Sequence, residues 1–330
     1  MNNKIDIAVL VTSISQRDIA IETVNYYSKI CSNVIFVDEE KTDLNEAEKQ
    51  LLSNKNVLYI PYKSNSKNTI CTTYEKRLIA AKSVKNSYVV HSNHDERYTR
   101  NGLQACVNEL KNNKELTFCA GQAVALRRND ISYHFTQAYA NLKAYKNIGK
   151  VEERLYYHAK NYAPIAHYSV WIKDKYIDVT KQTISIHESI PISNMMDEVV
   201  FELASDLSGN SSAIPQIYWI RNRINPPSHD SRRKGRYVFK IIENKLKKLL
   251  NDTHTDSVQV DLIIKSFWNN FPFVRPTIYS KTIISIKKIA RLYLVKKKYI
   301  TDVDNLLNEN KILFEKRDLS NALNSMMSQT

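Results

Sequence analysis

Hydrophobic positions in the first 126 residues form short continuous runs, separated by stretches in which apolar residues recur at helical spacing. Continuous runs predict strands that are covered on both faces, and the intervening periodicity predicts amphipathic helices. The expected strands are residues 5–14, 33–38, 56–62, 88–92 and 116–126, and the expected helices are residues 18–31, 45–52, 74–85 and 100–110. Because single helices separate the strands, the pattern predicts right-handed crossovers and a mainly parallel sheet flanked by helices.

The pattern loosens after residue 130 and becomes entirely helical near the C-terminus. Residues 196–207 predict a helix that ends at Gly209, a residue type common at helix C-termini. The pair Pro226 and Pro227, followed by a polar basic run, predicts a domain boundary. We therefore expect an α/β domain over 1–230, with one half over 1–126 and a second over 127–230, and a C-terminal helical extension over 231–330. Its expected helices are residues 237–250, 258–271 and 277–299.

The charge of the chain is concentrated in that extension. The whole sequence has a formal net charge of +14, and residues 234–301 hold 15 Lys and Arg against 4 Asp and Glu. Residues 283–299 interleave apolar and basic positions, as in helices that lie on anionic membrane surfaces. The alternative is a helix that packs its apolar stripe on the catalytic domain and leaves its lysines in water.

Glycine usage excludes two common phosphate-binding devices. Gly102 is the sole glycine before Gly121, so the first half contains neither a dinucleotide-binding GxGxxG turn nor a GxxxxGK loop. The sequence also lacks a signal-peptide pattern and an apolar run of about 18 residues that could span a membrane. We expect a cytoplasmic protein, with residues 283–299 as a candidate peripheral contact to the inner face of the membrane.

In open parallel sheets, ligands bind where the strands end. This rule selects residues 12–17, 38–40, 62–68 and 91–97. Side chains alternate along a strand, so we expect Asn93 and Asp95 to point together and His94 and Glu96 to point elsewhere. Amide and carboxylate oxygens at this spacing can hold Mg²⁺ or Mn²⁺, which in turn binds substrate phosphates. A cation would thus replace the missing glycine-rich loop.

Four segments together resemble the GT-A glycosyltransferases, in particular bacterial enzymes that build surface polysaccharides. They are VLVTSIS at 9–15, the acidic strand end at Asp38, YEKRLIAA at 74–81 and SYVVHSNHDERYT at 87–99. The likeness is good over 5–126 and loose over 127–230. It implies that Asp38 binds the nucleotide's base or ribose, that Arg77 matches the family's arginine, and that Thr12, Ser13, Arg17 and Asn93 line the donor. Because Asn93 replaces the first aspartate of the family's DxD motif, only Asp95 is carried over as a metal ligand.

The resemblance also implies residues for the chemical step. Inverting members place a carboxylate base on an acceptor-side helix, and Glu198, with Asp197 next, is similar in position and type. Arg221 and Arg223 would hold phosphate, and His229 would contact the metal or the diphosphate.

The implied activity is a metal-assisted, inverting transfer of a sugar from a phosphate-activated donor, expected to be a nucleotide sugar. The acceptor would be a glycan or a lipid-linked glycan in cell-surface polysaccharide synthesis. Two alternatives remain within this fold: a transferase that uses phosphoribosyl pyrophosphate, and an inactive relative that serves as a scaffold. A third, nucleic-acid binding through the basic residues, is disfavoured because the sequence has no RNP, zinc-finger or KH signature, so no nucleic acid is expected.

Each candidate residue also has a purely structural interpretation. Asp95 could cap the helix that begins near Thr99, and Glu198 could simply favour a helix N-terminus. Asp38 could belong to a solvated acidic run, Arg77 could pair with a glutamate on an exposed helix face, and His229 could be an ordinary loop histidine. Five aromatic residues could stack on an acceptor sugar or fill the core: Tyr156, Tyr157, Tyr162, Tyr168 and Trp171.

Overall fold

The computed structural model describes residues 4–13, 16–39, 42–64, 69–128, 133–139, 142, 144–161, 163–188, 197–222, 247, 260–265 and 316–327. The strands are β1 (Ile5–Ser13), β2 (Cys31–Asp38), β3 (Val57–Pro61), β4 (Tyr88–Asn93), β5 (Arg97–Tyr98), β6 (Leu116–Arg128), β7 (Tyr133–Gln137), β8 (Tyr145–Asn147), β9 (Val170–Ile172) and β10 (Asn210–Asn222). The helices are α1 (Arg17–Ile30), α2 (Glu46–Leu52), α3 (Thr69–Lys82), α4 (Arg100–Asn112), α5 (Val151–Lys160), the 3₁₀ turn η1 (Ala166–Tyr168), α6 (Lys173–Glu188), α7 (Asp197–Ser208) and α12 (Lys316–Met327).

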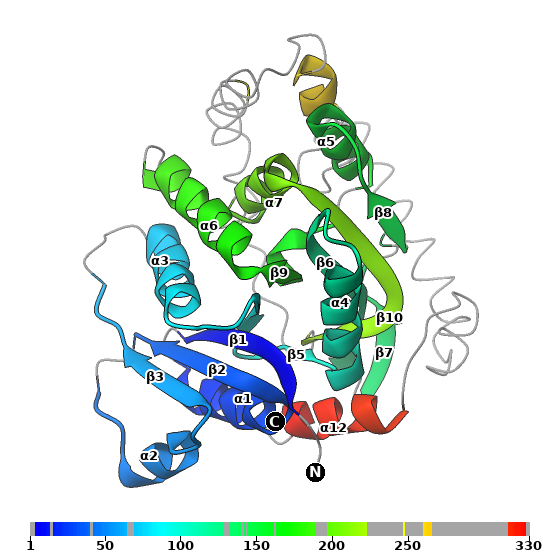
Figure 1. Cartoon of the computed structure of the whole chain (residues 1–330). Helices are drawn as coiled ribbons and strands as arrows, with labels where there is room; N and C mark the ends of the chain where they lie inside the picture. The colour runs from blue at the N-terminus through cyan, green and yellow to red at the C-terminus, as the bar shows by residue number, and fades with distance from the viewer. Residues whose placement is uncertain are drawn as a thin grey trace, which may run out of the picture.

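The described strands form one sheet with the order β3-β2-β1-β4-β9-β6-β10-β5, to which β7 adds beside β6 and β8 beside β10 (Figure 1). Pairing from β3 to β4 is parallel, as predicted from the alternation of strands and helices. The second part is mixed, because β9 runs antiparallel to both β4 and β6 while β6 and β10 are parallel. The predicted α/β sheet flanked by helices is confirmed.

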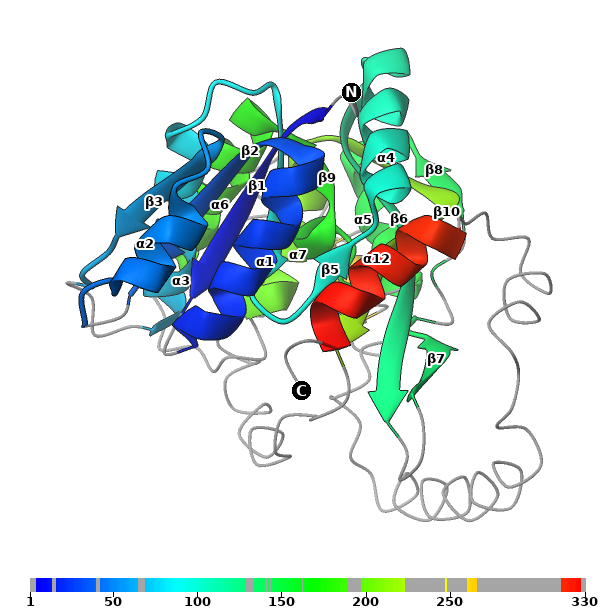
Figure 2. The same ribbon diagram turned by 90° about the horizontal axis from the view of Figure 1, so that it is seen from below.

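Helices cover both faces of the sheet, and the strands divide their side chains between them (Figure 2). On β1, Val9 and Val11 belong to a core cluster shared with α1, α4 and α12. Ala8 and Leu10 belong to a second cluster, shared with α3, α6 and α7. Both sets are fully buried, which explains why this strand reads as a continuous apolar run rather than an alternating one.

The C-terminal helix α12 contributes to the first of these cores. Its side chains Ala322 and Met326 are buried in the cluster formed with α1 and α4. The last described residues of the predicted extension therefore share a core with the predicted catalytic domain. Of the expected helices over 237–250, 258–271 and 277–299, only residues 247 and 260–265 are described, and the basic amphipathic segment 283–299 lies outside the described residues.

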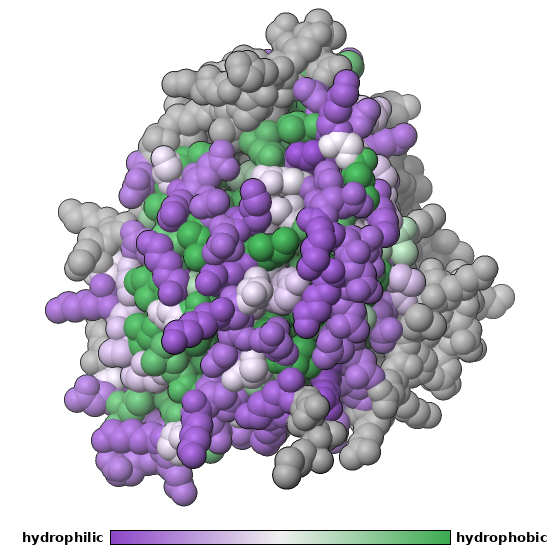
Figure 3. All heavy atoms as spheres, viewed as in Figure 1, coloured by the Kyte–Doolittle hydropathy of each residue, from purple (hydrophilic) through white to green (hydrophobic). Residues whose placement is uncertain are grey.

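The surface is polar over α4, on the face seen in Figure 1 (Figure 3). This helix buries Leu103, Cys106, Val107 and Leu110 and turns its polar side to solvent. None of the helices in the described part of the chain has the length and apolar composition needed to cross a membrane.

Candidate functional site

The strand register places the predicted donor-side residues together at the C-terminal ends of neighbouring strands. Ser13 pairs with Asp38 across β1 and β2, and Thr12 pairs with Asn93 across β1 and β4. Because all three strands are parallel, these residues lie where the strands end. The structure thus brings together Thr12, Ser13, Asp38 and Asn93, as the sequence predicts.

Asp38 forms a buried ion pair with Arg17. Nε of Arg17, the first residue of α1, lies 2.6 Å from Oδ2 of Asp38, and the Tyr59 hydroxyl donates to the same oxygen at 3.2 Å. Arg17 also donates to the backbone carbonyls of Thr42 and Asp43. Asp38 is 1% exposed, so its interpretation as part of a solvated acidic run is wrong. Arg17 fixes both the end of β2 and the segment that follows it.

Lys76 joins β1 to the same region and was missed by the sequence analysis. Its fully buried Nζ donates to the Ser13 carbonyl at 2.9 Å and to the Glu39 carboxylate at 2.7 Å. Burial lowers the pKa of Lys76, and the contact with Glu39 opposes this shift. The signal in the sequence is weak, because a lysine at a buried helical position resembles a surface lysine until its neighbours are known.

Arg77 is buried beneath these strand ends and has unused hydrogen-bond donors. It is 4% exposed, and its guanidinium carbon lies 4.8 Å from the centroid of the Tyr74 ring. Among the described residues, Nε and Nη1 of Arg77 have no hydrogen-bond partner. The alternative of an ion pair on an exposed helix face is therefore wrong. A buried cation with unmade bonds carries a free-energy cost that an anionic ligand would relieve.

Two histidines lie close to Arg77. Nε2 of His91 is 3.2 Å from Oγ1 of Thr12, and the rings of His91 and His167 meet edge to face at 5.9 Å. Burial, and then the positive charge of Arg77, lower the pKa of both histidines well below the usual value. Both imidazoles are accordingly neutral at pH 7, and Arg77 is a permanent positive charge in this part of the site.

The turn after β4 differs from the expected geometry. The strand ends at Asn93 and residues 94–95 form a turn, so the alternation of side chains stops there. Asn93 donates to Glu96 at 3.3 Å and to the Tyr168 hydroxyl at 3.5 Å. The expectation that Glu96 points away from Asn93 is therefore wrong. Thr99, rather than Asp95, accepts the capping hydrogen bond of α4, from Gly102.

Glu96 is the centre of a polar cluster that the sequence analysis did not identify. Its carboxylate accepts from Trp219 Nε1 at 3.0 Å and lies 3.2 Å from Nε of Arg221. The Arg221 guanidinium also lies over the rings of Tyr139, Tyr168 and Trp219, at 5.1 to 5.6 Å from their centroids. Arg221, predicted to hold phosphate, is thus engaged by a carboxylate and an aromatic group; Arg223 lies outside the described residues.

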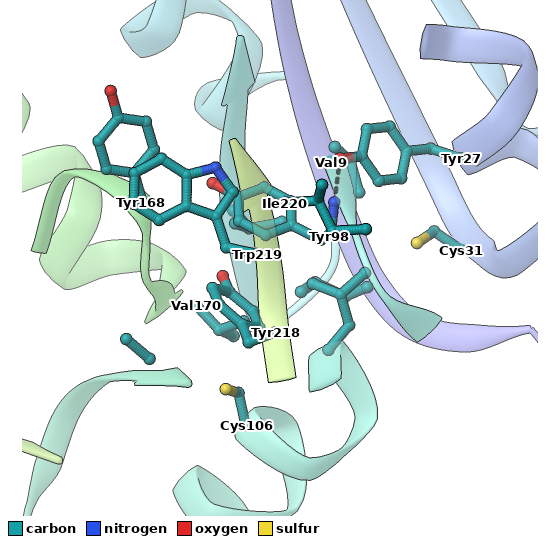
Figure 4. Close-up of a cluster of buried hydrophobic side chains, with 14 of the residues drawn as sticks. Val9, Tyr27, Cys31, Tyr98, Cys106, Tyr168, Val170, Tyr218, Trp219 and Ile220 are labelled. Atoms are coloured by element: carbon teal, nitrogen blue, oxygen red, sulfur yellow. Dashed lines mark hydrogen bonds between the residues drawn. The ribbon is translucent and has the colours of Figure 1, made fainter. Parts of the chain in front are cut away.

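Tyr168 links this cluster to the predicted base. Its ring lies against that of Trp219 (Figure 4), and the two stack with centroids 3.8 Å apart. Burial raises the pKa of Tyr168 well above its ordinary value, and the negative charges of Glu96 and Glu198 add to this shift. Glu198, a half-buried residue at the start of α7, therefore lies close enough to Tyr168 to influence its pKa. Tyr168 in turn contacts Asn93. The helix begins at Asp197.

The five aromatic residues that could stack on an acceptor sugar differ in their burial. Tyr168 and Trp171 are buried, and Trp171 stacks on Phe118 at 4.3 Å, so these two residues belong to the core. Tyr156 and Tyr157 are exposed on α5, and Tyr162 lies outside the described residues.

The described residues supply few ligands for a metal ion. Within them, no group of three or more His, Cys, Asp or Glu side chains is arranged to hold one. Asp95 is half-buried at the turn after β4, and its carboxylate makes no hydrogen bond or ion pair in the described part of the chain. His229 lies outside the described residues. This set fits Mg²⁺ or Mn²⁺ only in the manner typical of Mg²⁺, with one or two protein carboxylates and the rest from water and substrate phosphates.

Comparison with known proteins identifies the fold. Neither a protein-family model nor a curated protein sequence matches this chain. Residues 1–349 of S. aureus TarS match with a TM-score of 0.52 at 15% sequence identity, over 80% of this chain and 71% of that chain. The TarS complex with UDP-GlcNAc matches with a TM-score of 0.52 at 14% identity, over 80% and 72% of the two chains. The complex with UDP matches with a TM-score of 0.50 at 13% identity, over 80% and 71%. The chain thus has a mixed α/β fold similar to that of TarS.

Proposed function

We propose that this chain is a glycosyltransferase that moves a sugar from a nucleotide-sugar donor to a glycan or lipid-linked acceptor in cell-surface polysaccharide synthesis. The observation that carries the proposal is Arg77, a buried guanidinium two of whose nitrogens have no hydrogen-bond partner among the residues that the structure describes. It lies in a fold whose solved neighbours hold UDP and UDP-GlcNAc. A diphosphate is a dianionic acceptor group that would complete the hydrogen bonds of Arg77.

The proposed reaction is a direct displacement at the anomeric carbon of the donor sugar. The acceptor hydroxyl attacks this carbon, the bond to the diphosphate oxygen breaks, and the electron pair leaves with the nucleoside diphosphate. Glu198 takes the proton of the attacking hydroxyl. Because the hydroxyl attacks the face opposite the leaving diphosphate in a single displacement, the anomeric centre is inverted. Arg77 stabilises the negative charge that develops on the diphosphate.

Asp95 would hold a Mg²⁺ or Mn²⁺ ion in this proposal. The ion, when bound, supplies positive charge to the leaving diphosphate. Asn93 contributes by fixing the end of β4, through its contacts with Glu96 and Tyr168. Asp38, held by Arg17 at the end of β2, would face the nucleoside.

The proposal places the protein in the cytoplasm, where nucleotide sugars are made, and brings residues 283–299 to the anionic inner face of the membrane. Their interleaved apolar and basic positions support this location. A vesicle co-sedimentation assay with and without anionic lipid tests it, because we expect a lysine-rich segment with interleaved apolar positions to bind anionic vesicles more tightly than neutral ones.

A thermal-shift panel tests the proposed donor. We expect UDP sugars to raise the melting temperature, more so with Mn²⁺, and phosphoribosyl pyrophosphate to have no effect. If phosphoribosyl pyrophosphate alone raised the melting temperature, the donor would be phosphoribosyl pyrophosphate and not a nucleotide sugar. No response to any donor, together with DNA binding that survives moderate salt, would overturn the transferase proposal in favour of nucleic-acid binding.

A further inference from the structure

Helix α12 lies against β5 and the start of α4, which follow the turn that carries Asp95, although more than two hundred residues separate them in the sequence. It packs beside α1 and β5, as Figure 2 shows, and buries Ala322 and Met326 in the core. Two polar side chains on α12 contact the chain after β4: Asp318 contacts the first turn of α4, and Ser325 contacts Arg97 of β5.

Asp318 completes the N-terminal cap of α4. Its carboxylate oxygens accept from the backbone N–H groups of Arg100 at 2.9 Å and Asn101 at 2.7 Å. Thr99 accepts from the next N–H, that of Gly102, at 3.2 Å. Helix N-termini leave such donors without internal partners and favour a negative charge. A residue from the far end of the chain therefore fixes where α4 begins.

Ser325 acts on the same segment through Arg97. Arg97 is fully buried, and its Nε donates to Oγ of Ser325 at 3.1 Å. Its Nη1 donates to the carbonyls of His94 at 3.2 Å and Glu96 at 2.9 Å. The His94 carbonyl also accepts from the Thr23 hydroxyl of α1. The guanidinium of Arg97 thus hydrogen-bonds to the carbonyls of the residues before and after Asp95 and holds them in place.

We infer that α12 is a positioning element of the donor site. Asp318 fixes the residues after the turn, and Ser325 orients the guanidinium that holds the turn itself, so together they set the position of Asp95. The inference rests on the proposed function for its consequence, which is that donor binding with metal requires α12. Its structural part, that α12 orders residues 94–101, does not depend on any activity.

The test compares four variants of the full-length chain: Asp318→Ala, Asp318→Asn, Ser325→Ala and Asn324→Ala. Asn324 is exposed on the same helix and serves as the matched control. Titration calorimetry gives the dissociation constant of UDP with Mn²⁺ well below the melting temperature. Hydrogen exchange gives the protection of the amides over 94–103, and steady-state kinetics separates kcat from the KM for UDP-GlcNAc.

We expect Asp318→Ala to weaken UDP binding about 10-fold or more and to speed exchange over 94–103. Asp318→Asn, whose amide oxygen accepts one of the two bonds, should recover part of both properties. Ser325→Ala should act in the same direction without unfolding the chain, and Asn324→Ala should match the wild type. A lower melting temperature with unchanged UDP affinity and unchanged exchange over 94–97 would overturn the inference, because α12 would then only stabilise the core.

The proposed function and the proposed role of α12 can be rejected independently of each other. If the wild type bound neither UDP nor a sugar nucleotide, the proposed function would fall. Faster exchange over 94–97 in Asp318→Ala would still support the ordering of the turn by α12, and unchanged exchange over 94–97 would reject it.

Discussion

Nδ1 of His158 lies 2.6 Å from Oδ2 of Asp206, in a buried pair that joins α5 to α7. Nε2 of the same ring is 3.0 Å from the Ala163 carbonyl and 3.4 Å from Glu202. Glu202 accepts from the N–H groups of Ala166 and His167 at the start of η1. The network therefore ties the helix that carries Glu198 to the turn that carries Tyr168.

The charge on His158 should make the stability of the fold depend on pH. Burial opposes the charge on His158, but Asp206 and Glu202 outweigh it and raise the pKa of His158 to about 9. Because the folded pKa exceeds the unfolded value, the stabilisation is complete below about pH 6.5 and is lost as the pH rises through 9. We expect the wild type to lose on the order of 3 kcal/mol of unfolding free energy over this window. Urea denaturation at pH 6 and pH 9.5 measures it.

The control for that experiment is His158→Gln, which removes the titrating group. Its stability should change much less between the two pH values. An equal loss in wild type and variant would assign the pH dependence to other groups.

Replacing Arg77 by Met should separate stability from donor binding. The substitution removes a buried charge whose Nε and Nη1 have no partner among the described residues, so the melting temperature should stay constant or rise. Loss of charge-assisted bonds to a diphosphate should weaken UDP binding about 100-fold. Thermal unfolding and calorimetry measure the two effects. Lys82→Met, on the exposed end of the same helix, should leave UDP binding unchanged.

Asp95→Ala should abolish sugar transfer and the Mn²⁺ dependence of UDP binding without unfolding the chain. The side chain is half-buried and has no hydrogen bond in the described residues, so its loss leaves no structural partner unsatisfied. Circular dichroism and a transfer assay over a Mn²⁺ series provide the measurement. Full activity in this variant would remove Asp95 from the mechanism. Asp174→Ala, at an exposed position of α6, is the control.

Glu198→Gln should lower kcat about 10²- to 10⁴-fold, the usual contribution of a general base. The KM for the donor should change little, because the base acts on the acceptor. Initial rates with varied donor and acceptor distinguish the two effects. Normal turnover in this variant would rule out Glu198 as the base and would direct the search to Asp197.

The parallel part of the sheet is predictable from sequence because its evidence is local. Val9 and Val11 face one core and Ala8 and Leu10 the other, so β1 appears as an unbroken apolar run. The short strand β9 has no such signal, since three residues are too few to show a period. Its existence depends on the edges that β4 and β6 offer on either side.

Site residues at the ends of strands can be predicted from the sequence. Site residues whose positions are fixed by tertiary contacts cannot. Thr12, Asp38 and Asn93 follow from strand ends and parallel register. Glu96 lies on the same side as Asn93, contrary to the prediction, because the alternation of strand side chains does not continue through the turn at residues 94–95. Asp318 lies 217 residues from the N–H of Asn101 that it caps, a distance over which no local pattern carries information.

The three residues of β9 have a consequence for any attempt to divide the protein. They are the strand through which β4 and β6 belong to one sheet, and β10 pairs on the other side of β6. A fragment that ended at residue 126 would keep most of β6 but lose the three strands that pair with it, β7, β9 and β10, and it would leave one edge of β4 open. Such unpaired edges recruit strands from other molecules. We expect the first 126 residues, when expressed alone, to aggregate rather than fold as a nucleotide-binding module.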